Sequence, residues 1–130
     1  MPAMDAVKRR DPAVRARAMP ADTNPAGDIF GGWLMSQMDM AGEITARQRA
    51  RNRVVTVAVN AMTFHRPVHV GDVVSCYTSI ERIGRTSITV RIEAVAMRQD
   101  SGKHVPVTEG VFVYVALGQD GSPTAVSEST

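Results

Sequence analysis

The sequence predicts an α+β domain in which a curved antiparallel sheet of about five to six strands wraps around one long central helix. Two patterns support this prediction. A long segment at about residues 30–51 is apolar on most sides of a helix, and most of the chain after it alternates β-branched with polar residues. One flat sheet face does not cover a helix that is apolar on most sides, so we expect the sheet to curl around it.

Size and composition set the number of domains. The chain has 130 residues, 44% of them hydrophobic, and no change in composition divides it. We therefore expect a single domain over residues 1–130. The two polar ends, residues 1–12 and 119–130, are expected to be flexible tails.

A short edge strand and a loop are expected before the helix. Val14, Ala16 and Ala18 alternate with arginines, which is typical of a strand with one apolar face. Residues 19–29 contain several Pro, Asn and Gly residues and are expected to form a loop. Asp28 is placed to cap the start of the helix.

The helix is expected to stop near Asn52, and four strands should follow it. These strands are expected at residues 54–66, 73–83, 86–98 and 107–117. Turns rich in Gly and Asp separate them, and the tight connection at Gly84-Arg85 predicts a hairpin.

Charge and cysteine content narrow the class of protein. The net charge is only +2, and the positive excess lies in two local clusters, which argues against a general nucleic-acid binder and leaves room for a phosphate-bearing small molecule. The clusters are Lys8, Arg9, Arg10, Arg15 and Arg17, and then Arg47, Arg49, Arg51 and Arg53. A single cysteine, no secretory signal and no apolar run of bilayer length predict a cytoplasmic protein without a membrane partner.

Asp39 is the residue that most needs an explanation, because it lies in the apolar helix. Burying a carboxylate costs several kcal/mol unless another group compensates for it. Gly32, Ser36, Asp39 and Glu43 follow steps of four, three and four and so form one polar stripe. The stripe starts at the helix end where N–H groups are free. This pattern suits hydrolysis of an acyl carbonyl, with N–H groups holding the oxyanion and the carboxylate acting as base or nucleophile.

Pattern alone leaves a structural alternative open: Asp39 could face a subunit interface and accept hydrogen bonds there. We interpret Glu43 as a solvated or interface charge and Ser36 as a small packing residue, because no nucleophile elbow surrounds that serine. Asn24 could orient a water or a carbonyl at the mouth of the site, although an Asn before Pro25 is also an ordinary turn former.

Other reactive side chains give weaker signals. His65 and His69 are separated by Pro67 and cannot share a helix face, so we predict no metal site. Cys76 lies in a strand pattern and is interpreted as a small buried hydrophobic residue, and His104 is expected in a turn. Gly84-Arg85-Thr86-Ser87 could bind a phosphate or could be an ordinary turn.

The motifs themselves resemble a known family. Residues 19–42, MPADTNPAGDIFGGWLMSQMDMAG, resemble the signature of the YciA-type acyl-CoA thioesterases, which have the hotdog fold. Further segments match in order and at the usual spacing: residues 54–60, 62–64, Pro67, 70–74 and 84–88. The resemblance covers about residues 14 to 118.

The resemblance implies hydrolysis of acyl-CoA to free CoA and a carboxylic acid, with CoA as part of the substrate and no separate cofactor. It implies Asp39 as the catalytic acid, Asn24 as the loop amide and Gly32 as the helix-start glycine. CoA contacts are expected at Thr56, Val57, Arg66, Gly84, Arg85, Thr86 and Ser87.

The resemblance also implies an assembly. Subunits are expected to pair into a double hotdog and to assemble as a trimer of dimers, with Asn24 of one subunit facing Asp39 of its partner. Asn60 departs from the family, which often has an acidic residue there. Two alternatives remain open. One is a non-catalytic acyl-CoA-binding or regulatory module. The other is a dehydratase that acts on a carrier-linked acyl chain, which would require a His near the helix.

Overall fold

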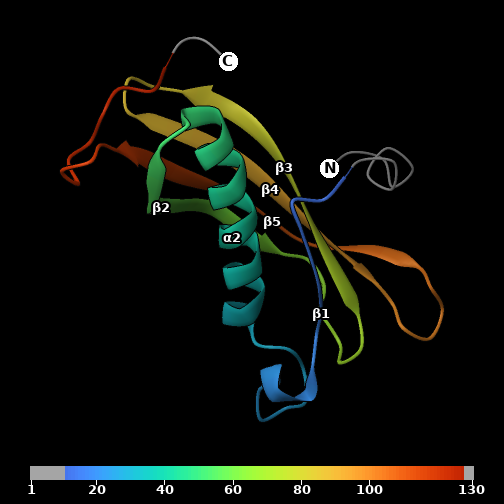
Figure 1. The fold of residues 1–130 in the computed structure, drawn as a ribbon. Helices are drawn as coiled ribbons and strands as arrows, with labels where there is room; N and C mark the ends of the chain where they lie inside the picture. Colours follow the sequence, from blue (N-terminus) through green and yellow to red (C-terminus); the bar gives the residue numbers. More distant parts are fainter. Residues whose placement is uncertain (1–10, 128–130) are drawn as a thin grey trace.

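The computed structural model describes residues 11–127 and confirms the predicted α+β arrangement of one long helix and a curled antiparallel sheet. The elements are β1 (Val14–Arg17), η1 (Pro20–Asp22), α2 (Gly31–Ala50), β2 (Arg53–Phe64), β3 (Val73–Ile83), β4 (Ser87–Met97) and β5 (His104–Leu117). Figure 1 shows α2 lying across the inner face of the sheet. No helix within the described residues is long and apolar enough to span a bilayer.

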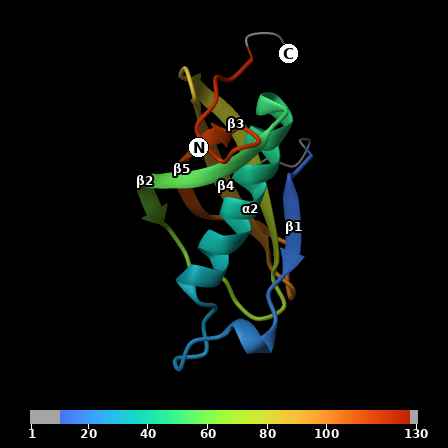
Figure 2. The same cartoon turned by 60° about the vertical axis from the view of Figure 1, so that its left-hand side comes forward.

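The sheet has five strands in the order β1-β3-β4-β5-β2, and every neighbouring pair is antiparallel. The edge strands β1 and β2 lie on either side of α2, as the turned view in Figure 2 shows. Alternate residues of β4, among them Ile88, Val90 and Ile92, are buried against the helix. The helix contributes Leu34 and Met38 to the same core.

Irregular pairing in β2 bends that strand and decides which side chains face the helix. Thr56 pairs with Tyr114 and Val59 pairs with Phe112, with a register shift between them. Because Tyr114 and Phe112 are two residues apart on β5, they share a face, so Thr56 and Val59 share it too despite being three apart. A second shift near Ala61, whose φ is 51°, curls the strand further.

Several predicted boundaries differ from the structure. Phe30, not Asp28, is the N-cap of α2 and offers no side-chain cap, while Arg51 ends the helix in the left-handed region at φ 55°. The loop at residues 19–29 contains the short 3-10 helix η1. His104 begins β5 instead of lying in a turn, because a register shift lets the strand continue through Pro106.

The polar segment after β5 packs onto the protein up to the last described residue. Val126 is buried in the core, and its N–H donates to the Arg85 carbonyl at 2.8 Å. The Thr124 N–H donates to Ala116 at 2.8 Å. Residues 119–127 therefore differ from the predicted free tail, whereas residues 1–10 and 128–130 lie outside the described part.

A buried ion pair fixes the turn before β3. Arg98 Nη1 lies 2.5 Å from Asp72 Oδ2, and their side chains are only 15% and 3% exposed. The same carboxylate accepts the His69 N–H at 2.9 Å. The Asp72 carbonyl accepts the Ala18 N–H at 2.9 Å, so the pair also anchors the end of β1.

We expect Arg98→Ala to lower the free energy of unfolding by about 3–5 kcal/mol, because it leaves a buried carboxylate without its cation. Urea unfolding at a fixed protein concentration measures this. Arg82→Ala, which removes an exposed arginine from β3, is the matched control and should change stability by less than about 0.5 kcal/mol. Equal effects of the two substitutions would contradict a structural role for the pair.

Candidate active site

A hollow of about 290 Å³ lies between α2 and the strands β2 and β5, and Asp39 lines it. Its other lining residues are Gly32, Met35, Ser36, Thr56, Val59 and Phe112. Gly32, Ser36 and Asp39 of the predicted polar stripe therefore face an open depression, whereas Glu43 does not line it. The shared face of Thr56 and Val59, set by the irregular pairing in β2, provides the opposite wall.

Two hydroxyl groups from different strands hold the Asp39 carboxylate. Thr56 Oγ1 donates to Asp39 Oδ1 at 2.7 Å, and the Tyr114 hydroxyl lies 3.0 Å from the same oxygen. The Tyr114 hydroxyl also lies 3.0 Å from the Asp39 main-chain carbonyl. Asp39 is thus tied to both β2 and β5, which is the compensation that a half-buried carboxylate requires.

The Tyr114 phenol is held in its protonated form. Burial raises the pKa of Tyr114 far above its usual value, and the negative charges of Asp39 and Glu43 raise it further. The hydroxyl therefore keeps its proton and remains available as a hydrogen-bond donor.

Gly42 gives Tyr114 room to reach the helix. A Cβ built at Gly42 would lie 2.7 Å from Tyr114 Cζ and 2.8 Å from Ile92 Cδ1. Both distances are shorter than real Cβ contacts, so only glycine allows this approach. Gly42 stands three residues after Asp39, on the buried side of the same helix.

Gly32 lies at the open start of the helix. The first helical hydrogen bond runs from the Leu34 N–H to the Phe30 carbonyl at 3.3 Å, so the Gly32 N–H precedes the helical ladder. No atom lies within 4 Å of a Cβ built at Gly32. Gly32 lies seven positions before Asp39, or about 10 Å along the helix axis.

The remaining predicted site residues do not meet Asp39 within one protomer. Asn24 lies in the loop before the helix, where its side-chain oxygen accepts the N–H groups of Ala26 and Asp28 at 3.0 and 3.2 Å. Arg66 is exposed just after β2, and Val57, beside Thr56, is 55% exposed.

The Gly84-to-Ser87 hairpin forms a second hollow near the far end of the helix. The Gly84 N–H donates to the Ser87 carbonyl at 2.8 Å, and the Thr86 carbonyl accepts the Ala116 N–H at 2.9 Å. Gly84 and Arg85 line a depression of about 600 Å³ together with Arg49, Ile83 and residues 125–127. This depression brings two guanidinium groups to one surface.

Other reactive groups lie apart from Asp39. Cys76 is fully buried, and burial raises the pKa of its thiol to about 12, which disfavours the nucleophilic thiolate form. His65 lies 3.7 Å from Glu109. Across residues 11–127, no three His, Cys, Asp or Glu side chains are grouped as metal ligands would be.

Sequence reasoning missed Tyr114 and Gly42. Tyr114 is one of a run of alternating residues in β5, which by itself predicts only a core position. Gly42 is the feature of the sequence that could have indicated this contact, because a glycine in the middle of an apolar helix indicates a close approach by another group.

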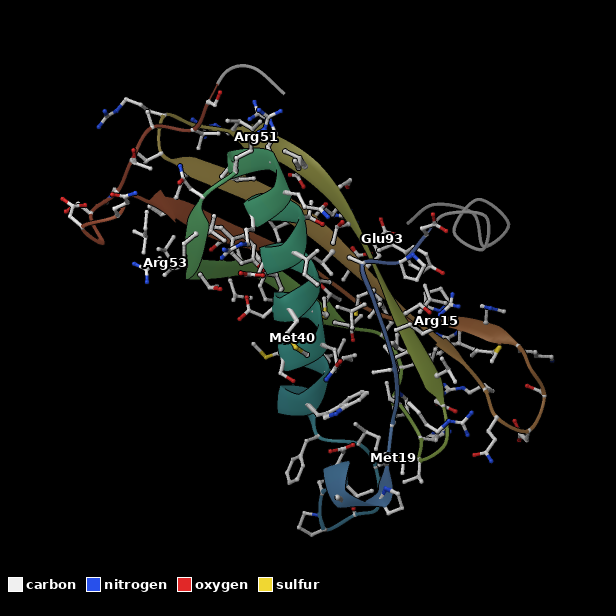
Figure 3. The ribbon with its side chains drawn as sticks, in the orientation of Figure 1. Arg15, Met19, Met40, Arg51, Arg53 and Glu93 are labelled. Atoms are coloured by element: carbon white, nitrogen blue, oxygen red, sulfur yellow. The ribbon has the colours of Figure 1, made fainter. Side chains whose placement is uncertain are left out.

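An apolar surface beside the site is uncovered in the protomer. Met40 is 48% exposed, and Figure 3 shows it on the side of α2 that faces away from the sheet. Ile44 is 38% exposed one turn further along the helix. On the edge strand β2, Val59 shares the helix-facing side with Thr56 and is 39% exposed, and Val55 and Val57 are exposed as well, at 40% and 55%. Surfaces of this kind mark interaction sites.

Comparison with known proteins gives consistent matches. Residues 26–102 match the thioesterase superfamily. The acyl-CoA thioester hydrolase YciA of Salmonella typhimurium is 51% identical over 126 residues, 95% of each chain.

Two crystal structures have the same fold. A hexameric hotdog-fold thioesterase of Campylobacter jejuni is similar with a TM-score of 0.88 and 43% identity over 92% of each chain. A hexameric broad-specificity acyl-coenzyme A thioesterase, solved with one aspartate changed to alanine, has a TM-score of 0.88 and 44% identity over 92% of this chain and 88% of that one.

We expect Gly42→Ala to destabilise the protein by about 1–3 kcal/mol, because the new methyl group overlaps Tyr114 and Ile92. Thermal or urea unfolding measures the change. Gly32→Ala is the control, since its methyl group meets open space and alanine favours the helix by up to about 1 kcal/mol. If Gly42→Ala were as stable as Gly32→Ala, the close approach of Tyr114 would not exist in solution.

Proposed function

The chain belongs to the thioesterase superfamily as a YciA-type acyl-CoA thioester hydrolase, and from this premise we propose that Asp39 activates the water that cleaves the thioester. The observation that carries the assignment is the geometry of this carboxylate. Asp39 lines an open hollow, is held by two hydroxyl groups, and shares the hollow with Gly32 at the free N-terminal end of α2.

The reaction follows from these positions. Asp39 takes a proton from water as the oxygen attacks the thioester carbonyl carbon, and the oxyanion is stabilised by the Gly32 N–H and the positive end of the helix. The C–S bond then breaks, CoA leaves as a thiolate, and the proton passes from Asp39 to the thiolate or to solvent. The other route is attack by Asp39 itself, which forms a mixed anhydride that water then hydrolyses.

The proposed CoA contacts extend away from Asp39. Thr56 lines the hollow, and Val57 follows it in β2. The Gly84-to-Ser87 hairpin, with Arg85 and the nearby Arg49, offers guanidinium groups to phosphates. Arg66 is exposed after β2 and is assigned to CoA by family resemblance. No metal or separate cofactor takes part in the proposed reaction.

We also propose that the working unit is a dimer, assembled further as a trimer of dimers. The apolar surface of Met40 and Ile44 borders the site, and β2 is an open sheet edge next to it. A second copy that covers this surface would bring its Asn24 loop toward Asp39, which would account for the distance between the two within one protomer. The similar proteins from Campylobacter jejuni and the broad-specificity enzyme are hexameric.

We expect Asp39→Asn and Asp39→Ala to lower kcat for acyl-CoA hydrolysis by about 10²–10⁴-fold while the protein stays folded, because the base is lost. A thiol-release assay over acetyl- to long-chain acyl-CoA measures this, and the buried Cys76 thiol adds no background from the folded protein. Glu43→Gln, one helical turn away, is the control and should retain most activity. Wild-type turnover by Asp39→Asn would refute the mechanism, and no thiol release by the unmodified protein would favour a binding module.

We expect Ile44→Asp to weaken the proposed dimer, because it would place a carboxylate in an apolar interface. Light scattering gives the mass of the assembly, and the same assay gives its activity. Val70→Asp is the control: Val70 is 40% exposed, close to the 38% of Ile44, but lies outside α2 and β2. An unchanged assembly mass in Ile44→Asp would exclude this face as the dimer interface.

A further inference from the structure

The two carboxylate oxygens of Asp39 have different surroundings. Oδ1 receives both hydroxyl contacts, from Thr56 at 2.7 Å and from Tyr114 at 3.0 Å. Oδ2 has no hydrogen-bond partner among residues 11–127, although the side chain lines the hollow. A carboxylate that is held through one oxygen presents the other oxygen in a fixed direction.

We propose that Tyr114 is a positioning residue for thioester hydrolysis: together with Thr56 it holds Oδ1 of Asp39, so that Oδ2 is the oxygen that meets the attacking water. The inference rests on the function proposed above. It assigns Tyr114 a role that acts through Asp39, without contact with the substrate. It also gives Thr56 a second role besides lining the hollow.

Tyr114 is suited to this role because its surroundings restrain it. It is 0% exposed and lies in β5, which is paired on both sides by β4 and β2. Its ring is stacked with Phe112 at a centroid distance of 6.5 Å and an interplanar angle of 14°. Gly42 admits the ring edge to the helix. A donor on a rigid strand fixes its acceptor more closely than one on a loop does.

Tyr114 also ties the helix backbone to the sheet at the same point. Its hydroxyl lies 3.0 Å from both the main-chain carbonyl and Oδ1 of Asp39. The phenol has one proton, so the two acceptors share it, and Thr56 supplies Oδ1 with a donor of its own. This arrangement limits rotation of the carboxylate, which would otherwise exchange its two oxygens.

The test begins with Tyr114→Phe, which removes the hydroxyl and keeps the ring. Hydrogen bonds to a charged group predict a loss in kcat of about 10–100-fold, with KM little changed because the hydroxyl does not contact substrate. The matched control is Tyr77→Phe. Tyr77 is also buried, at 2% exposed, but packs with Val95 in a separate cluster, and its substitution should leave kcat unchanged.

A second pair of variants tests the same idea without touching the core tyrosine. Thr56→Val removes the other donor to Oδ1 and should lower kcat by a similar factor. Thr56→Ser keeps the hydroxyl and should restore most of that loss, whatever either change does to KM. This pair decides the question if Tyr114→Phe does not fold, as judged by circular dichroism and thermal unfolding.

The outcomes separate this inference from the proposed function. Wild-type kcat in Tyr114→Phe, or equal kcat in Thr56→Val and Thr56→Ser, would overturn the positioning role while an inactive Asp39→Asn still supported the mechanism. An active Asp39→Asn would overturn the mechanism itself. A fall in kcat for Tyr114→Phe but not Tyr77→Phe, together with rescue by serine at position 56, supports the inference.

Discussion

The pair of hydrogen bonds on Asp39 Oδ1 is the constraint on which the rest of this site depends. It joins the helix to β2 through Thr56 and to β5 through Tyr114, so one carboxylate links three elements that are distant in sequence. The irregular pairing of β2 brings Thr56 to the correct face, and Gly42 lets Tyr114 come close. The desolvation of Asp39 is offset by these donors, and the same donors leave Oδ2 available for chemistry.

The fold leaves one side of α2 uncovered in a single protomer. The sheet curls around one side of α2 and buries Leu34 and Met38, while Met40 and Ile44 on the other side remain uncovered. The hollow that contains Asp39 opens beside this uncovered side. The hydrophobic effect that would drive a second copy onto the helix is therefore the same force that would close the site and exclude water from it.

Periodicity in the sequence predicted the helix and all five strands, because apolar spacing follows directly from which face is buried. The stripe of Gly32 and Asp39 was predictable for the same reason. The hydroxyl groups that hold Asp39 were not predictable from periodicity. Alternation in β5 predicts only a core position for Tyr114, and the register shift in β2 depends on pairing with a strand some sixty residues away. The predicted start of β5 at residue 107 was three residues too late, because the strand continues through Pro106 with a register shift. The proposed approach of Asn24 to Asp39 involves a second copy, which periodicity within one sequence does not describe.

The close fit between Gly42 and Tyr114 links two positions that are 72 residues apart in the chain. A residue larger than glycine at position 42 would overlap the tyrosine at position 114. A residue smaller than tyrosine at position 114 would remove the close contact that requires glycine at position 42. Among homologues, positions 42 and 114 should therefore be substituted together or not at all. This would appear as covariation of the two positions even where the overall sequence has diverged.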